Sequence, residues 1–250
     1  MIRIPYSIWF SIVCIFMAFF SCKNEDEKLT DYQLGYHFYP ISIGKSIVYK
    51  TDTIMYQKTF GINGDTSTSY IKETVVDSFR DQVGQLVYNV EISYRNNDSL
   101  PWDLIDNTFI TVTANNILRN DFGFDFIKLV FPVTKNKSWN GNIYLDPETE
   151  LKFNGEFFKP FSYWNGKSYY YKEISDNQKI GDISYTQTLT VEESDYSEPY
   201  NKIYSTVIYA LDVGMVYREF WLLNSQNSDL SIPWPNRAEY GAIIKQTRIQ

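Results

Sequence analysis

Cysteine and histidine are almost missing from this chain, which excludes much of the usual chemistry of protein sites. The two cysteines are Cys14, inside an apolar N-terminal segment, and Cys22, at its end. If the segment is removed at Cys22, one thiol remains, so no disulfide can form within the chain. The only histidine, His37, excludes histidine pairs as metal ligands and most catalytic triads. Because His37 stands among aromatic residues, we expect it to be structural.

Basic residues are also scarce, with 23 lysines and arginines against 30 acidic residues. Recognition of nucleic acid requires clustered Lys and Arg that neutralise phosphates, so no nucleic-acid partner is expected. Residues 44–46 and 166–168 resemble the end of a phosphate loop, but both lack the earlier glycine of that motif. The sequence has no G-x-S-x-G elbow and no calcium-loop pattern. We therefore expect no catalytic residue, no metal and no cofactor.

Long apolar runs are absent except at the N-terminus. Residues 1–3 include the positively charged Arg3, residues 4–20 are almost wholly apolar, and Ser21 precedes Cys22. This order is typical of a secretory signal peptide, and the run is at the lower limit for crossing a bilayer. A small residue directly before Cys resembles a bacterial lipobox. The resemblance implies that residues 1–21 are removed and that Cys22 carries the lipid, with an uncleaved membrane anchor as the alternative.

The segment behind the lipidation site is charged and lacks apolar periodicity, so residues 22–34 are expected to form a flexible tether. Removal of the signal peptide also removes Arg3, which changes the formal net charge from −7 to −8. Lys23 stands where an inner-membrane retention signal has Asp. The acidic cluster after it resembles the export signal of surface lipoproteins in the Bacteroidota. We expect a lipid-anchored outer-membrane protein, with the cell surface favoured over the periplasmic face.

Aromatic residues are abundant, at 18% of the chain. Aromatic and β-branched residues suit the pleated, half-buried surface of a strand. Segments with period-two alternation and intervening turn signals predict strands. Their ranges are 46–52, 70–79, 86–94, 109–113, 117–118, 168–174, 183–193, 202–211, 215–223 and 242–249. We expect one all-β domain over residues 35–250, an antiparallel meander of about ten strands that forms a curved sheet, barrel or half-barrel. A β-sandwich is the alternative.

Turn signals place the connections between these strands. Residues 63–65, Asn-Gly-Asp, predict a hairpin turn, because Asn and Gly tolerate the positive φ that tight turns require. Residues 115–116 predict another. Residues 121–133 are compatible with a short helix or a buried strand, since periodicity alone cannot distinguish them. No segment predicts a long helix.

A nonapeptide occurs twice, with an offset of 92 residues. The copies are residues 39–47, YPISIGKSI, and residues 131–139, FPVTKNKSW. Pro fixes φ, and Gly or Asn adopts a left-handed turn at low cost. We expect Gly44 and Asn136 in tight turns ahead of a strand, with Ile47 and Trp139 buried. The repeat indicates either two related halves that meet near residues 125–130 or convergence on a common turn.

These residues and a C-terminal motif resemble a broad group of Bacteroidota outer-membrane lipoproteins. The usual start of that group, aromatic-Pro-Leu-x-x-Gly-x-x-Trp-x-Tyr, is similar to residues 39–49, although Ile stands at both the Leu and the Trp positions. The usual end, Tyr-Ala-x-x-Val-Gly-x-Val, matches residues 209–216. The resemblance implies a lipid anchor and a curved antiparallel sheet, and it implies no reaction. We expect Gly214 in a hairpin turn or β-bulge, with Tyr209 and Tyr217 paired on adjacent strands.

Aromatic rings in polar, turn-rich segments are the best candidates for a binding site, because exposed rings stack on sugar faces; packing in the core is the alternative. The candidate glycan-stacking residues are Trp102, Trp164, Tyr169, Tyr170, Tyr171 and Trp234. Glycoside hydrolysis requires two acids that flank a cleft. The available acids are Asp103, Asp106, Glu192, Glu193 and Asp195, and their spacing does not place any two together.

The sequence thus predicts a lipid-anchored, extracytoplasmic module that binds or scaffolds and does not catalyse. One alternative is a carrier that holds an apolar ligand in a barrel cavity. Another is a glycan-binding or glycan-processing surface protein. The expected partners are the membrane, through the lipid, and a glycan or an apolar small ligand.

Overall fold

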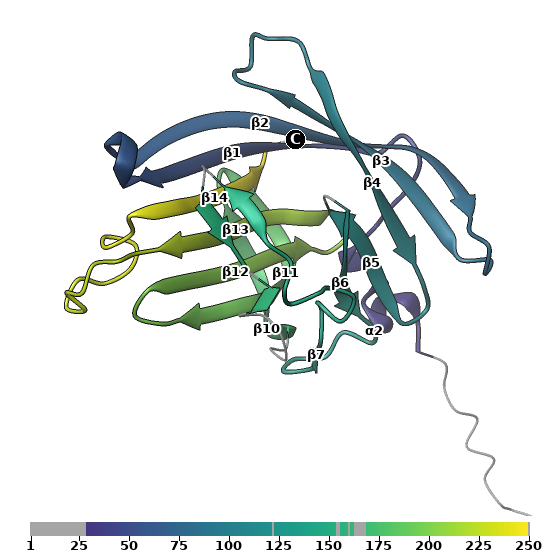
Figure 1. The fold of residues 1–250 in the computed structure, drawn as a ribbon. Coiled ribbons are helices and arrows are strands. Elements are labelled where there is room, and N and C mark those ends of the chain that lie inside the picture. The colour runs from purple at the N-terminus through teal and green to yellow at the C-terminus, as the bar shows by residue number, and fades with distance from the viewer. Residues whose placement is uncertain (1–28, 122, 154–155, 160, 163–168, 250) are drawn as a thin grey trace, which may run out of the picture. The chain divides into compact units, whose positions relative to one another are not determined.

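The computed structural model describes residues 29–121, 123–153, 156–159, 161–162 and 169–249 (Figure 1). Its contacts divide the chain into two units, Met1–Thr30 and Asp31–Gln250. Of the first unit only Leu29 and Thr30 are described, and both are exposed. The predicted signal peptide and the lipidation site at Cys22 lie outside the described residues. No helix among the described residues is long and apolar enough to cross a membrane.

The second unit is built mainly from strands, twelve of which form one antiparallel sheet. These strands are β1 (Ser46–Gln57), β2 (Ile62–Arg80), β3 (Leu86–Arg95), β4 (Asp103–Val112), β5 (Asn116–Asp121), β6 (Phe124–Val130), β7 (Ser138–Trp139), β10 (Tyr169–Ile180), β11 (Ile183–Ser197), β12 (Asn201–Ala210), β13 (Gly214–Asn224) and β14 (Tyr240–Arg248). The other elements are the ladder of β8 (Leu151–Phe153) with β9 (Glu156–Phe158), helix α2 (Asp31–Leu34), and the 3₁₀ turns η1 (Tyr36–Phe38) and η2 (Lys58–Phe60).

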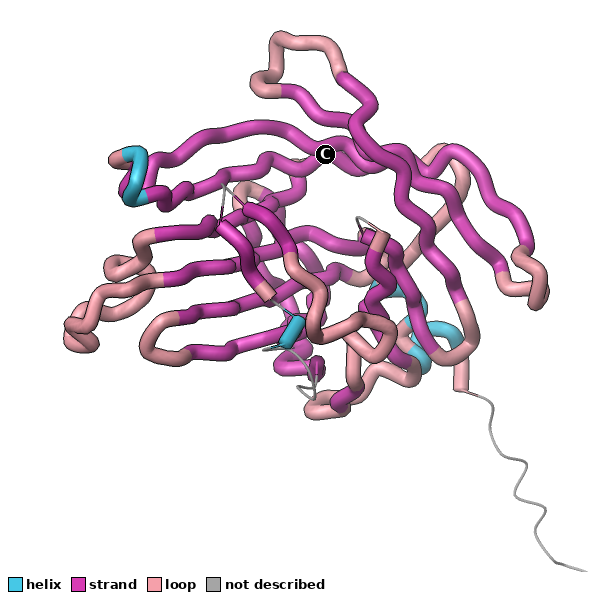
Figure 2. The backbone as a smooth tube through the Cα atoms, viewed as in Figure 1, coloured by secondary structure: helices cyan, strands magenta, loops and turns pink. Residues whose placement is uncertain are grey.

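The strand order is β6-β5-β4-β3-β2-β1-β14-β13-β12-β11-β10-β7, a meander in which β1 pairs with β14. We call β1–β6 the first half and β7 with β10–β14 the second half. The sheet curls until its two edges approach each other, which gives a nearly closed, barrel-like form (Figure 2). The all-β prediction of a curved sheet or barrel is confirmed, with two strands more than the roughly ten expected from turn spacing.

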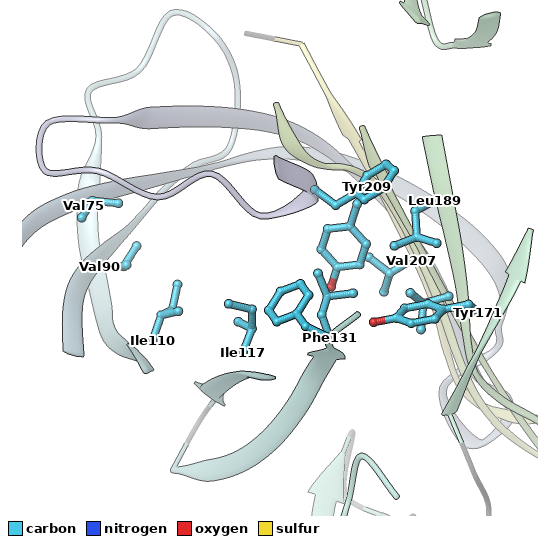
Figure 3. Close-up of a cluster of buried hydrophobic side chains, with 12 residues drawn as sticks. Val75, Val90, Ile110, Ile117, Phe131, Tyr171, Leu189, Val207 and Tyr209 are labelled. Atoms are coloured by element: carbon cyan, nitrogen blue, oxygen red, sulfur yellow. The ribbon is translucent and has the colours of Figure 1, made fainter. Parts of the chain in front are cut away.

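The main hydrophobic core fills the inside of the curved sheet. Aliphatic side chains of β2–β5 face rings and aliphatic side chains of β10–β12 across the interior (Figure 3). The fully or largely buried members are Phe38, Val75, Val90, Ile110, Ile117, Leu129, Phe131, Tyr171, Leu189, Val191, Val207 and Tyr209. They alternate with more exposed residues along their strands, as the period-two pattern predicted.

The first hairpin turn comes earlier than predicted. β1 and β2 are joined by η2, where Gly61 has φ 70°, and residues 63–65 lie inside β2. The register of the two strands shifts between Met55 and Tyr56, and Gly64, at φ 85°, is the extra residue of this β-bulge. Gly64 of the predicted Asn-Gly turn does have a positive φ, but it lies in a β-bulge and not in the turn between the two strands.

The structure also bears on three other predicted segments. The ambiguous residues 121–133 contain strand β6 and no helix in their described part. The hairpin predicted at residues 115–116 is confirmed, because it connects β4 with β5. The flexible tether predicted for residues 22–34 extends too far, since α2 already begins at Asp31 and the carbonyl of Leu34 accepts a hydrogen bond from Val133.

The two copies of the nonapeptide adopt the same turn. Gly44 has φ 85° and Asn136 has φ 64°, so the prediction of left-handed turns is confirmed. The next residue in each copy is a lysine whose N–H donates to the carbonyl three residues back, at 3.1 and 3.0 Å. Ile47 and Trp139 are only half-buried, so the burial predicted for them is met in part.

The strand beside each turn is also bonded in the same way. The N–H of Gly44 donates to the carbonyl of Val75 at 2.8 Å, and the N–H of Asn136 donates to that of Tyr171 at 2.9 Å. Val75 and Tyr171 return a bond to the lysine that follows each turn. A register shift follows directly after each of these two residues. This equivalence, bond for bond, agrees with two related halves and with convergence on a common turn alike.

The C-terminal motif forms the β12–β13 hairpin. Gly214 begins β13 with φ 101°, as expected for a hairpin turn. The tyrosine pairing is wrong, because Tyr209 pairs with Met215 and Ile208 pairs with Tyr217. Between these pairs β13 carries one extra residue, which shifts the register by one.

Candidate functional site

A cavity of about 70 Å³ lies inside the curved sheet. Its walls come from the segment ahead of β1 and from strands of both halves. The apolar walls are Pro40, Ile41, Ile47, Val75, Val90, Ile110, Val207, Gly214 and Met215, and the polar and charged walls are Tyr39, Lys45, Tyr49, Glu73, Arg119, Asp121, Lys128, Tyr209, Arg218 and Gln246. A space of this size has room for about five water molecules or one small molecule of similar bulk.

Arg119 on β5 is the centre of the charged wall. Its two terminal nitrogens donate to the two carboxylate oxygens of Glu73 on β2, at 2.9 and 2.7 Å. Its Nε donates to Oδ1 of Asp121 at 2.6 Å. Such two-pronged pairing is the strongest form of a charged hydrogen bond. Burial alone would raise the pKa of Asp121, but Arg119 and the other cations nearby hold it well below its usual range.

Lys128 on β6 and Glu193 on β11 connect the two halves. The lysine Nζ lies 3.1 Å from Oε1 of Glu193, whose Oε2 accepts a hydrogen bond from Ser205 at 2.7 Å. Both residues are extra residues at register shifts of their ladders, and a bulge redirects its side chain. Burial lowers the pKa of Lys128. Burial would raise the pKa of Glu193, but Lys128 and Arg218 bring it below its usual value.

Arg218 on β13 lines the same cavity without a carboxylate partner among the described residues. Its Nε is buried and has no hydrogen-bond acceptor there. Oδ2 of Asp121 is likewise buried without a donor, and Lys128 Nζ is 3.9 Å away from it. An unpaired buried polar group costs about 1–3 kcal/mol. Arg218 and Asp121 thus each have one buried atom without a hydrogen-bond partner among the described residues.

Lys45, from the first nonapeptide, supplies a further cation. Its Nζ donates to the carbonyl oxygens of Pro40, at 2.7 Å, and of Val213, at 2.9 Å. Burial lowers the pKa of Lys45 to about 8. An ammonium group has three donors, so one remains for another acceptor.

A clamp around Asp212 holds the segment ahead of β1 against the β12–β13 turn. Nδ1 of His37 lies 2.5 Å from Oδ1 of Asp212, and the Tyr32 hydroxyl donates to Oδ2 at 3.1 Å. The Asp212 N–H donates to the His37 carbonyl at 2.7 Å, and the Tyr32 ring stacks on the imidazole. His37 thus fixes a segment that forms part of the cavity wall.

Side chains bridge the place where the edge strand β6 meets the second half of the sheet, which we call the seam. The Tyr171 hydroxyl accepts a hydrogen bond from the Val130 N–H at 2.8 Å and donates to the Val130 carbonyl at 2.6 Å. Trp139 Nε1 donates to the Ile127 carbonyl, and the Ile127 N–H donates to the carbonyl of Gly141. These bonds take the place of a strand ladder on the edge of β6.

The predicted glycan-stacking residues do not form one platform. Tyr169 and Tyr171 are both 0% exposed, so their rings offer no face to a sugar and the prediction is wrong for them. The hydroxyl of Tyr169 donates to buried Asn142. Tyr170 is half-buried on the opposite face of β10, and Trp164 lies outside the described residues.

The remaining two candidates each have a cation over the ring. The guanidinium of Arg95 lies 4.3 Å from the ring centre of Trp102, and Lys72 lies 4.8 Å from it. The guanidinium of Arg237 lies 4.4 Å from the ring centre of Trp234. Because a cation occupies a face of each ring, that face is not open for stacking on a sugar.

The acids considered for glycoside hydrolysis are also dispersed. Glu193 alone among them reaches the interior, where Lys128 neutralises it. The others are Glu192, which pairs with Lys172, Asp195, which pairs with Lys202, and Asp103 and Asp106, which lie on β4 in the other half. No two of the five face each other across the cavity.

The charged cavity itself was missed by the sequence reasoning, although a signal was present. Period two places Glu73 on the same face as Val75, and Arg119 on the same face as Ile117. Charged residues at core-facing positions indicate a buried polar network. Lys128 gave no such signal, because its inward direction depends on a bulge that its sequence does not announce.

Comparison with models of known protein families and with curated proteins gave no match. The class of this protein is therefore defined by its fold and site. It is an antiparallel, barrel-like sheet around a small charged cavity.

Proposed function

We propose that the mature protein, from Cys22 onward, is a lipid-anchored extracytoplasmic binding protein that holds a small polar ligand inside its sheet. The observation that carries this proposal is Arg218, a cation on the wall of one cavity that has no carboxylate partner among the described residues. A ligand with an acceptor group would pair with its guanidinium.

The size and lining of the cavity favour a polar ligand over the apolar ligand of a carrier. Pockets for drug-sized apolar molecules measure roughly 300–1,000 Å³, whereas this cavity measures about 70 Å³. An apolar ligand against Arg218 would also bury a charged group without giving it an acceptor, which is costly.

The charges of the site favour binding over catalysis. A general acid or base works best when its pKa lies near the operating pH. Asp121 and Glu193 have pKa values below their usual ranges because cations surround them, so both stay ionised near neutral pH. They are suited to holding Arg119 and Lys128 in place, and less suited to moving a proton.

The membrane anchor is supported by the N-terminal pattern and by the resemblance of residues 39–49 and 209–216 to Bacteroidota outer-membrane lipoproteins. One acyl chain gives only marginal attachment, and several give durable anchoring. We expect Cys22→Ser to release the protein from the membrane fraction. A variant that still pellets with membranes after a high-salt wash would contradict the lipid anchor. Protease treatment of intact cells distinguishes the surface, which we favour, from the periplasmic face.

A thermal-shift panel on the detergent-solubilised mature protein tests the binding proposal. The panel contains polar molecules of about four to eight heavy atoms, a size set by the cavity, and the uncharged hydrocarbon n-hexane as an apolar probe. We expect some polar members to raise the melting temperature of the wild type. They should have no effect on Val207→Phe, which places a ring in the cavity. Stabilisation by n-hexane alone would support the apolar carrier instead, and stabilisation by none would contradict the proposal.

A further inference from the structure

The cavity wall carries more positive than negative charge. Four cations, Lys45, Arg119, Lys128 and Arg218, line it, against the two carboxylates of Glu73 and Asp121. Glu193 behind Lys128 adds a third negative charge, which still leaves one cation in excess. A ligand with one negative charge would balance the site.

Two of the four cations are already committed to protein carboxylates. Arg119 uses all three of its side-chain nitrogens on Glu73 and Asp121. Lys128 is paired with Glu193. Among the described residues, Arg218 has no such partner, and its guanidinium has the planar fork geometry that matches a carboxylate.

Part of the remaining cavity wall is aliphatic, and the rest includes Tyr39, Tyr49, Tyr209 and Gln246. Val75, Val90 and Ile110 come from the first half, and Val207 comes from the second (Figure 3). Figure 3 shows the two groups facing each other across the interior. A short hydrocarbon chain between them would bury apolar surface on both sides, which is favourable.

We infer that the ligand is a short-chain aliphatic carboxylate, with its carboxylate on Arg218 and its chain between the valines of the two halves. This inference rests on the proposed function. The volume of the cavity limits the chain to about three to five carbons. A phosphate would leave the aliphatic walls without a partner, and a neutral amide would leave the excess positive charge unbalanced.

Calorimetric titration of the detergent-solubilised mature protein with butyrate, butyramide and inorganic phosphate tests this inference. Butyrate and butyramide have the same shape and differ in charge. We expect butyrate to bind at least about tenfold more tightly than either of the others, because charge-assisted bonds are much stronger than neutral ones. This comparison uses the wild-type protein, so it does not depend on the folding of any variant.

Two arginine variants locate the effect. Arg218→Gln should weaken butyrate binding at least about tenfold, whereas Arg80→Gln, the same change at an exposed site away from the cavity, should leave it unchanged. Equal binding of butyramide would overturn the carboxylate while leaving a small polar ligand in place. Equal binding of phosphate would overturn the aliphatic chain. Binding of none of the three would overturn the inference, and the thermal-shift panel then decides the proposed function separately.

Discussion

The two halves of the sheet begin with the same turn and then diverge. Gly44 and Asn136 have the same left-handed backbone and the same hydrogen bonds to the neighbouring strand. At the residue that receives those bonds, the first half has Val75 and the second half has Tyr171. The valine lines the cavity, whereas the tyrosine hydroxyl closes the seam on Val130. The same turn and backbone hydrogen bonds thus hold a side chain that lines the cavity in the first half and a side chain that bonds to β6 in the second half.

The halves also differ in their buried charges. The first half contributes Glu73, Arg119 and Asp121, which are paired among themselves, and Lys128, which lies 3.9 Å from Asp121 in its own half and 3.1 Å from Glu193 in the other. The second half contributes Glu193, which completes the pair with Lys128, and Arg218. Neither half alone pairs all of its buried charges well. Pairing of these charges therefore favours the assembly of the two halves around one cavity. This conclusion can be tested by the following changes.

The largest expected effect comes from breaking the pair between the halves. Removal of one partner of a buried ion pair costs about 3–5 kcal/mol, so Lys128→Met or Glu193→Leu should strongly lower the free energy of unfolding in urea. The double variant should recover much of the loss, because no lone charge stays buried. The control is Lys202→Met, at a more exposed pair with Asp195, which should cost less than about 1 kcal/mol. If Lys202→Met lowered the free energy of unfolding as much as Lys128→Met does, the Lys128–Glu193 pair would have no special role in joining the two halves.

The next effect concerns the seam. Tyr171→Phe removes the hydroxyl that serves both backbone groups of Val130, so it should cost about 1–3 kcal/mol by urea unfolding. Tyr170→Phe changes the neighbouring, half-buried tyrosine and should cost less. If the two variants unfold alike, the seam is not held by the Tyr171 hydroxyl.

A smaller effect is expected at the shared turn. No atom lies within 4 Å of a Cβ built on Gly44, so Gly44→Ala meets only the backbone cost of its positive φ. That cost is about 1–2 kcal/mol, which should lower the melting temperature by a few degrees. Asn136→Gly should be neutral or slightly stabilising, because Gly adopts the same φ without strain. A neutral Gly44→Ala would show that the two turns are not equivalent.

The smallest effect concerns the clamp at Asp212. The hydrogen bond from His37 lowers the pKa of Asp212, so its contribution to stability is complete above the usual Asp pKa of about 4. The contribution is lost as the pH falls through the lower pKa of the folded state. Asp212→Asn should cost less than about 1 kcal/mol at pH 7, since the group is exposed. A difference from the wild type that persists at low pH would assign the effect to packing instead of charge.

The sequence was sufficient for the fold but not for the cavity. Alternation of apolar residues predicted most strands, because a strand with one buried face imposes that pattern directly. The Asn-Gly signal at residues 63–64 was assigned to a hairpin turn, but these residues lie in a β-bulge. Sequence does not distinguish the two, since both require a positive φ. Lys128 and Glu193 meet across more than sixty residues of chain through two bulges. Such a contact depends on how the halves fold together, and local sequence does not contain it.

The central claim is that a short-chain carboxylate binds inside the sheet, between the two halves. The most direct test is a titration of methyl-labelled protein with butyrate, followed by NMR of the valine methyl groups. We predict shifts at Val75, Val90 and Val207, which line the cavity. Val48 and Val87 are also buried but do not line it, and their signals should not move. Shifts confined to Val48 and Val87, or no shift at any of these five valines, would contradict the account.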